Sequence, residues 1–125
     1  MQVRELAEIC AVQFKGNLVI RPIRFEAKGQ VLPGHRHNFD HVTNVALGTV
    51  RFTMTFPDGR VREETHTAPA WVEVPKEAQH QLESLSDNAQ CFCVFAHRDQ
   101  DGSVAEFVTD QHKADVFPHF REESH

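Results

Sequence analysis

The stretch Gly34-His35-Arg36-His37-Asn38-Phe39-Asp40-His41 carries three of the nine histidines of this 125-residue chain. On a β-strand, residues two apart project from the same face, so His35 and His37 can bind one ion from the same side. His41 has the same parity and can join them if the chain bends. A second segment, residues 75–80, places a turn directly before His80. Four imidazoles from two strands can therefore meet at one metal ion, although histidines at this spacing can also be ordinary surface or core residues.

The rest of the chain shows the alternation of a β protein. Apolar and polar side chains alternate through residues 50–56, and Pro57-Asp58-Gly59 then supplies the turn of a hairpin. No long segment has the spacing of an amphipathic helix. Short β-rich runs separated by Gly, Pro, Asn or Asp are typical of a sandwich or barrel. Further strands are expected at residues 18–25, 43–47, 71–74 and 91–96.

Size and composition limit the classes of function. A chain of 125 residues has room for one domain, and a net charge of -5 provides no basic patch for nucleic acid. No segment has the roughly 20 apolar residues of a membrane span, and the charged N-terminus is unlike a signal peptide, so we expect a cytoplasmic protein. Three cysteines agree with a reducing compartment. Cys91 and Cys93 share a strand face, which allows a soft-metal site, but burial in the core is the commoner role.

The first histidine segment resembles the first motif of the cupin superfamily. That motif runs Gly, five residues, His-x-His, three or four residues, Glu, six residues, Gly. Here Gly29 is followed by five residues, His35-Arg36-His37, three residues, His41, six residues and Gly48, so every spacing matches and histidine replaces glutamate.

The second cupin motif is kept less well. Pro75 and His80 match it, whereas Pro69, Glu77 and Ser84 stand where Gly, Gly and Asn are usual. A left-handed turn at the second of these glycine positions would strain Glu77, because that residue has a Cβ.

The resemblance covers about residues 20–98 and implies an all-β fold. Residues 1–125 would form a single-domain cupin, a double-stranded β-helix or jelly-roll barrel, with a short C-terminal tail in residues 110–125. It also implies a metal site formed by four histidines. These are His35, His37, His41 and His80.

We expect this site to hold one divalent transition metal. Imidazole suits such ions better than it suits Mg or Ca, and the resemblance favours Fe(II), with Mn, Ni, Cu and Zn as alternatives. Four neutral ligands leave the charge of the ion uncompensated, which strengthens it as a Lewis acid. The alternation along the strands predicts that five residues face the interior, where they would line an apolar substrate pocket or form part of the barrel core. They are Val45, Leu47, Phe52, Met54 and Phe56.

Three functions fit a cupin metal site. The first is a dioxygenase-like enzyme acting on a small chelating enolisable substrate of the diketone or flavonol type. The alternatives are a small-molecule-binding module without turnover, and a metal-dependent isomerase or lyase, which needs a base. The catalytic residues are unknown, and Glu83 and His97 are weak candidates for an acid or base. The chain has no tyrosine, so the cysteine–tyrosine crosslink of some thiol dioxygenases is excluded.

We also expect a homodimer. The family resemblance implies one, and apolar residues gather near both ends of the chain. Trp71 is expected either to cover the mouth of the barrel or to lie outside it at a subunit contact. The apolar residues near the ends are Leu6, Ile9, Val12 and Phe14, and Val116, Phe117 and Phe120.

Overall fold

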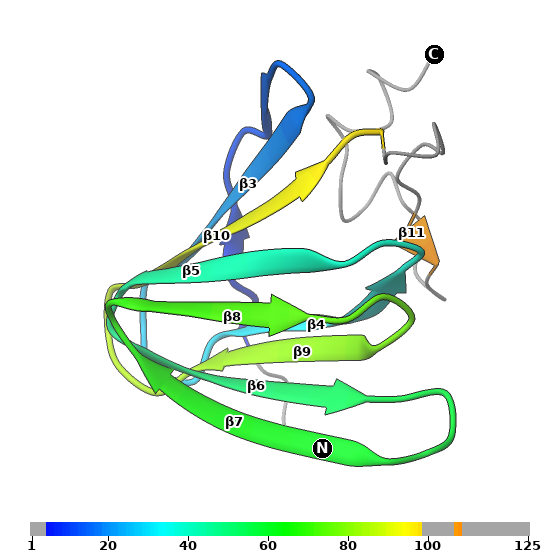
Figure 1. Cartoon of the computed structure of the whole chain (residues 1–125). Helices are drawn as coiled ribbons and strands as arrows, with labels where there is room; N and C mark the ends of the chain where they lie inside the picture. Colours follow the sequence, from blue (N-terminus) through cyan, green and yellow to red (C-terminus); the bar gives the residue numbers. More distant parts are fainter. Residues whose placement is uncertain (1–4, 99–106, 109–125) are drawn as a thin grey trace.

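The computed structural model describes residues 5–98 and 107–108, and this part of the chain is built from strands in two sheets (Figure 1). One sheet has the order β1-β3-β10-β5-β8, with β2 paired to β3, and the other has the order β11-β4-β9-β6-β7. The strands are β1 (Glu8–Ile9), β2 (Gln13–Lys15), β3 (Leu18–Phe25), β4 (Val31–His37), β5 (His41–Leu47), β6 (Thr49–Thr55), β7 (Val61–Thr67), β8 (Ala70–Val74), β9 (Gln79–Ser84), β10 (Ala89–Ala96) and β11 (Phe107–Val108).

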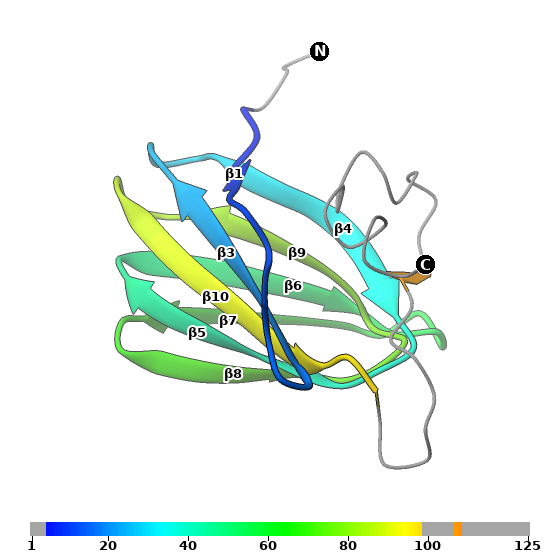
Figure 2. The ribbon, with the colours of Figure 1, turned by 90° about the horizontal axis from the view of Figure 1, so that it is seen from above.

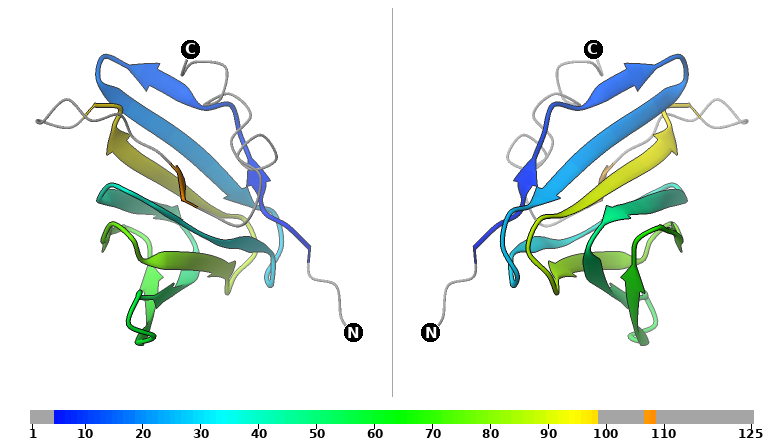
Figure 3. Two further views of the ribbon diagram at one scale, coloured as in Figure 1. Left: turned by 90° about the vertical axis from the view of Figure 1, so that its right-hand side faces the viewer. Right: turned by 90° about the vertical axis from the view of Figure 1, so that its left-hand side faces the viewer.

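From β3 to β10 the chain passes back and forth between the two sheets, as in a jelly roll, and only the hairpin of β6 and β7 stays within one sheet. β3, β5, β8 and β10 belong to one sheet, while β4, β6, β7 and β9 belong to the other. Seen from above, the two sheets lie as layers over one another (Figure 2), and the side views show the same two sheets from two further directions (Figure 3). The all-β fold predicted from the alternating sequence pattern is confirmed.

The core lies between the inner faces of the sheets, because alternate residues of each strand point inward. The largest apolar side chains there include Ile23, Phe25, Phe52, Met54 and Leu82, all fully buried. Removing this apolar surface from water is the main force that holds the sheets together. A second, smaller cluster is formed by Val19, Phe39 and Phe95, with Ile9, Val12 and Phe14 packed against it.

The inward positions predicted from parity hold for Val45, Phe52 and Met54, which are buried, and Phe56 is partly buried at the edge of the core. The interior position predicted for Leu47 is wrong, because 54% of this residue is exposed. A register shift explains the difference. Gln90 pairs with Leu47 and Cys91 pairs with Val45, so two residues along β5 correspond to one residue along β10. At this bulge the inward and outward positions of β5 are exchanged.

Trp71 lies outside the barrel on the edge strand β8 and is exposed. Of the residues that suggested a dimer, Ile9, Val12 and Phe14 pack within the chain, whereas Leu6 is exposed. Val116, Phe117 and Phe120, like the expected tail at residues 110–125, lie outside the described residues. The homodimer stays a prediction. In the part of the chain that the structure describes, no helix has the length and apolarity to cross a membrane.

Gly48, the last glycine of the first motif, makes the tight turn from β5 to β6. Its φ is 78°, a left-handed conformation, and an added Cβ would lie 2.5 Å from Ser86 Oγ and 2.9 Å from Ala89 Cβ. Ala89 is part of the buried core, so the backbone has little room to move.

We therefore predict that Gly48→Ala lowers the free energy of unfolding by about 2–4 kcal/mol, from the left-handed backbone and the overlap together. Gly59→Ala is the matched control, because Gly59 also has a positive φ of 91° but nothing within 4 Å of the added Cβ. Its cost should stay near ~1 kcal/mol. Urea unfolding measures both, and equal costs would contradict the role given to the overlap.

Candidate metal centre

Three histidines from three strands meet inside the barrel. His37 ends β4, His41 begins β5, and His80 is the second residue of β9, which pairs with β4 and β6. The two sheets splay apart at the end where β4 finishes and β5 begins, on the right of Figure 1. The short connection from His37 to His41 brings the chain from one sheet to the other, so the three side chains approach one another from both sheets.

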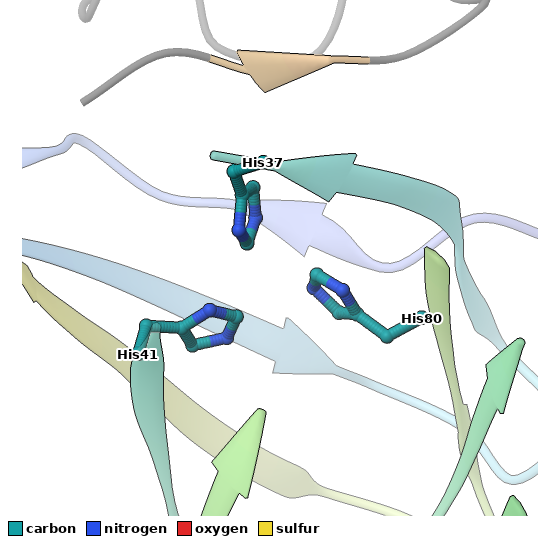
Figure 4. Close-up of side chains that lie close together, drawn as sticks. All are labelled: His37, His41 and His80. Carbon is teal, nitrogen blue, oxygen red and sulfur yellow. The ribbon is translucent and has the colours of Figure 1, made fainter. Parts of the chain in front are cut away.

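The three imidazole rings face one another (Figure 4). Their centroids are 4.8 Å apart for His37 and His41, 4.9 Å for His37 and His80, and 5.0 Å for His41 and His80. One ligand nitrogen from each ring lies within 4.8 Å of the other two, and all three residues are buried. This arrangement could hold one metal ion.

Burial keeps these imidazoles neutral. Loss of hydration lowers the pKa of His80 to about 4, although a hydrogen bond with the Ala78 carbonyl opposes the shift and the Arg21 charge adds to it. Burial also lowers the pKa of His41 well below its ordinary value, and His80 and Arg21 lower it further. Neutral imidazole is the form that binds a metal, so near pH 7 no proton has to be displaced from these two rings.

Hydrogen bonding and stacking support the same assignment. Among the described residues, no hydrogen-bond partner reaches either of the buried ring nitrogens of His41, and a metal ion would supply one. His80 Nδ1 lies 3.3 Å from the Ala78 carbonyl oxygen, so Nδ1 can donate there and Nε2 can bind the metal. The His37 ring stacks on Phe39 at 4.3 Å, and Phe39 stacks on Phe95 at 4.4 Å, which holds the His37 ring in place. These residues fit a divalent transition metal.

The turn before His80 has the left-handed conformation of the motif even though its glycine is replaced. Glu77 has a φ of 66°, and its N–H donates a 2.8 Å hydrogen bond to the His37 carbonyl oxygen. The turn on one strand is thereby joined to the last residue of β4, which fixes His37 and His80 relative to each other.

His35 pairs with His80 through the backbone of β4 and β9, after a register shift between Leu32 and His35. The side chain of His35 lies outside the described part of the structure. Its role as the fourth ligand therefore stays a prediction.

Neither of the weak acid and base candidates belongs to the group of three clustered histidines. Glu83 differs in parity from His80 and lies on the outer face of β9, where its carboxylate pairs with Arg51 at 2.9 Å. The His97 ring packs edge-on against Phe14 at 5.9 Å and is not one of the three clustered residues. The role of either residue as an acid or base stays a prediction.

The two inward cysteines are core residues. Cys91 and Cys93 are buried, and burial raises the pKa of the Cys91 thiol far above its ordinary value. The described residues give no metal-binding group that includes either cysteine. The core interpretation of these residues therefore fits the structure better than a soft-metal site.

Arg21 is the residue that sequence reasoning missed. It is fully buried on β3 and lies close enough to lower the pKa of both His41 and His80. Its parity is that of Val19, Ile23 and Phe25, three core residues of the same strand. The sequence does carry a signal for this position, because Arg21 is the one charged residue among the inward-facing apolar residues of that strand.

A hollow of about 500 Å³ lies against β5, β8 and β10, and His41 is the one member of the cluster in its lining. Its lining includes Asp40, His41 and Glu73. The five residues predicted for a substrate pocket do not line it, and four of them belong to the core or pack against it. The hollow brings solvent close to the start of β5.

Comparisons with known proteins agree on the fold. No model of a protein family and no curated protein sequence matches the chain. Among solved structures, a variant of oxalate decarboxylase from B. subtilis is similar with a TM-score of 0.62 and 19% identity, over 84% of this chain and 29% of that one. A cupin superfamily protein from Desulfitobacterium hafniense gives 0.60 and 13%, over 77% and 83%. An oxalate oxidase gives 0.61 and 15%, over 75% and 46%.

The chain thus spans less than a third of the oxalate decarboxylase and about half of the oxalate oxidase. One further solved structure of the B. subtilis decarboxylase is described by its Mn(II) centres. At these identities the similarity establishes the fold alone. The chain has the cupin fold, as the sequence resemblance implied.

We predict that the protein, prepared without a histidine tag, binds about one Co(II) per chain and that His37→Ala binds at least tenfold less tightly. Removal of a ligand leaves two described imidazoles to hold the ion. His66→Ala is the control, because His66 lies on the edge strand β7, pairs with Glu64 at 2.9 Å and is not one of the three clustered histidines. Metal analysis and Co(II) titration measure the effect. Full metal content in His37→Ala would exclude His37 as a ligand.

The metal-free protein should lose stability as the pH falls from about 6.5 to about 4. The folded state depresses the pKa of His80, so in this window the unfolded state binds more protons and acidification favours unfolding. Burial of His80 alone should account for on the order of 3 kcal/mol between these limits. Urea unfolding at pH 7 and 4.5 measures the loss. The same pH dependence in His80→Gln would show that His80 is not its source.

Proposed function

We propose that the chain is a metal-dependent enzyme of the dioxygenase type, acting on a small enolisable compound that chelates the metal, such as a diketone or a flavonol. The observation that carries the proposal is the cluster of three buried imidazoles inside a cupin barrel. His37, His41 and His80 would hold the ion, with His35 as the predicted fourth ligand. When bound, the ion would act as a Lewis acid that favours the deprotonated form of a chelating substrate.

The surrounding residues favour an anionic substrate. All the candidate ligands are histidines, so no ligand carboxylate competes with the substrate for the positive charge. Val45, Phe52 and Met54 form apolar walls in the same core, which lowers the local dielectric and strengthens the attraction between the ion and an enolate. Stacking on Phe39 keeps His37 in one orientation. Fe(II) is the metal we propose, and Mn(II) is the alternative that the Mn(II) centres of a structural neighbour support.

The other two functions have less support. An isomerase or lyase needs a base next to the substrate, and the buried polar residues in the described ranges include no carboxylate. Glu83, the acid nearest in sequence to the second motif, pairs with Arg51 on the outer face of the sheet. A binding module needs only the metal and the pocket, and the experiment below separates it from an enzyme.

We predict oxygen uptake by the Fe(II)-loaded protein with acetylacetone or quercetin, and at least a hundredfold lower rate in His80→Ala. The variant loses a predicted metal ligand, whereas His66→Ala should keep the full rate. An oxygen electrode and product analysis measure turnover, with iron content determined on each sample. If acetylacetone binds but neither acetylacetone nor quercetin causes oxygen uptake at full iron content, the oxygenase is excluded and the binding module is left.

A further inference from the structure

The outer faces of the two sheets differ in composition. On β6 and β9 of the second sheet, the outward residues that alternate with the buried core are polar, as expected for a sheet face in water. They include Thr53, Thr55, Gln79 and Gln81. The corresponding outward residues in the middle of the first sheet are mostly apolar. They include Phe92, Val94 and Ala96 on β10, and Val42, Asn44 and Ala46 on β5. A continuous apolar outer face of this kind indicates an interaction surface.

The strand register arranges this outer face in rows that cross β3, β10, β5 and β8, which lie side by side (Figure 1). The middle row is formed by Pro22, Phe92, Asn44 and Trp71. One flanking row is formed by Ile20, Val94, Val42 and Glu73, and the other by Arg24, Gln90 and Leu47. Trp71 and Leu47 are 67% and 54% exposed, although both are large and apolar. The three rows carry charge only at Arg24 and Glu73.

Arg24 and Glu73 lie at opposite corners of this face. They are separated by three strand spacings across the sheet, about 14 Å, and by the distance from Ile20 to Arg24 along it, about 13 Å. The diagonal that joins them therefore runs at about 45° to the strands, and its midpoint lies near Phe92 and Asn44. If two copies pack face to face about a two-fold axis through this midpoint, with their strands crossing at about 90°, Arg24 of each copy meets Glu73 of the other. Orthogonal crossing is one of the two usual ways in which sheets pack.

The same two-fold arrangement also covers the exposed apolar side chains. With the strands crossed at about 90°, β8 of one copy runs along the row of Arg24, Gln90 and Leu47 of the other. Glu73 then lies on Arg24, and Trp71, two residues earlier on β8, lies about 7 Å further along that row, on Gln90 and Leu47. One symmetry operation thus pairs both charges and covers both exposed apolar residues.

The face is large enough for a second copy of the chain. With the further row of Leu18 and Ala96, it spans about 19 Å across four strands and about 28 Å along them, a flat area of roughly 500 Å². Projecting side chains add accessible surface to this flat area. Specific interfaces bury upwards of roughly 600 Å² on each partner. Their centres are poor in charge and rich in aromatic residues, as the middle row with Phe92 and Trp71 is.

We propose that the outer face of the first sheet is the interface of a homodimer, in which two sheets cross at about 90° and Arg24 of each protomer pairs with Glu73 of its partner. The contact is thereby placed on β3, β10, β5 and β8. The apolar residues near the N-terminus are not needed for it, because Ile9, Val12 and Phe14 pack within the chain.

The test is charge reversal at the two corners, read as the dimer dissociation constant from sedimentation and light scattering between about 1 and 100 μM protein. Because Glu8 lies opposite Arg24 on β1 and would repel a glutamate there, Glu8→Gln is the common background. Glu73→Arg places two arginines together at each corner of the dimer. Glu63→Arg is the matched control, because Glu63 is an exposed glutamate on β7, the edge strand of the other sheet. Urea unfolding checks that each variant is folded.

We expect Glu73→Arg to weaken the dimer at least tenfold and Glu63→Arg to change it less than threefold. The double reversal Arg24→Glu with Glu73→Arg restores opposite charges at both corners, so it should recover most of the affinity. A monomer at every concentration would overturn the inference. A dimer that Glu73→Arg and Glu63→Arg affect equally would place the interface elsewhere and overturn it too. Failure of the double reversal to recover affinity would overturn the pairing of Arg24 with Glu73.

Fluorescence gives an independent readout, because Trp71 is the only tryptophan in the chain. Dilution of the unmodified protein should shift its emission to longer wavelength as the dimer separates and Trp71 enters water, at the same concentrations at which the mass falls. A monomeric mass with short-wavelength emission at every concentration would show that residues outside the described ranges cover this face, and it would overturn the inference. A dimer whose emission does not change on dissociation would exclude Trp71 from the interface and overturn the proposed arrangement.

Discussion

The burial of basic side chains in an apolar barrel is the constraint on which the rest of this structure depends. Removing a polar group from water costs about 1–3 kcal/mol where hydrogen bonding does not fully replace its hydration, and a charged group costs more. His37, His41, His80 and Arg21 are all buried in the described core. The apolar surface of the two sheets helps to offset that cost. The same burial keeps His41 and His80 neutral and makes them ready ligands.

Two tight turns order the strands that carry the histidines. Glu77 adopts a left-handed conformation that costs a residue with a Cβ about 1–2 kcal/mol, and it persists because its N–H is bound to the His37 carbonyl. Gly48 allows the chain to leave β5 within a space that admits no Cβ. The turn at Glu77 fixes β9 relative to β4, and the turn at Gly48 fixes β6 relative to β5. The positions of the histidines therefore follow from turns several residues away from them.

Much of this could be predicted from the sequence because the relevant signals are local. Strands with one buried face alternate in polarity, and the ligands of a strand-borne metal site recur at fixed short spacings, which is why the fold and the clustering of His37, His41 and His80 follow from the chain. Leu47 was misplaced because the bulge opposite Gln90 depends on the pairing of β5 with a distant strand. Arg21 was missed because a charged residue in a strand is usually solvated, and only the closed barrel shows that its side chain is inside.

The histidine at the glutamate position and the buried arginine explain one another. A glutamate at residue 41 would place a carboxylate one layer above Arg21, on a neighbouring part of the same inner face, where low dielectric makes opposite charges attract strongly. Such an attraction would draw the carboxylate away from a bound metal ion. Imidazole at His41 avoids this effect, since it binds a metal through nitrogen and repels no cation while neutral. The substitution within the motif thus avoids a carboxylate that a bound metal ion and Arg21 would both attract.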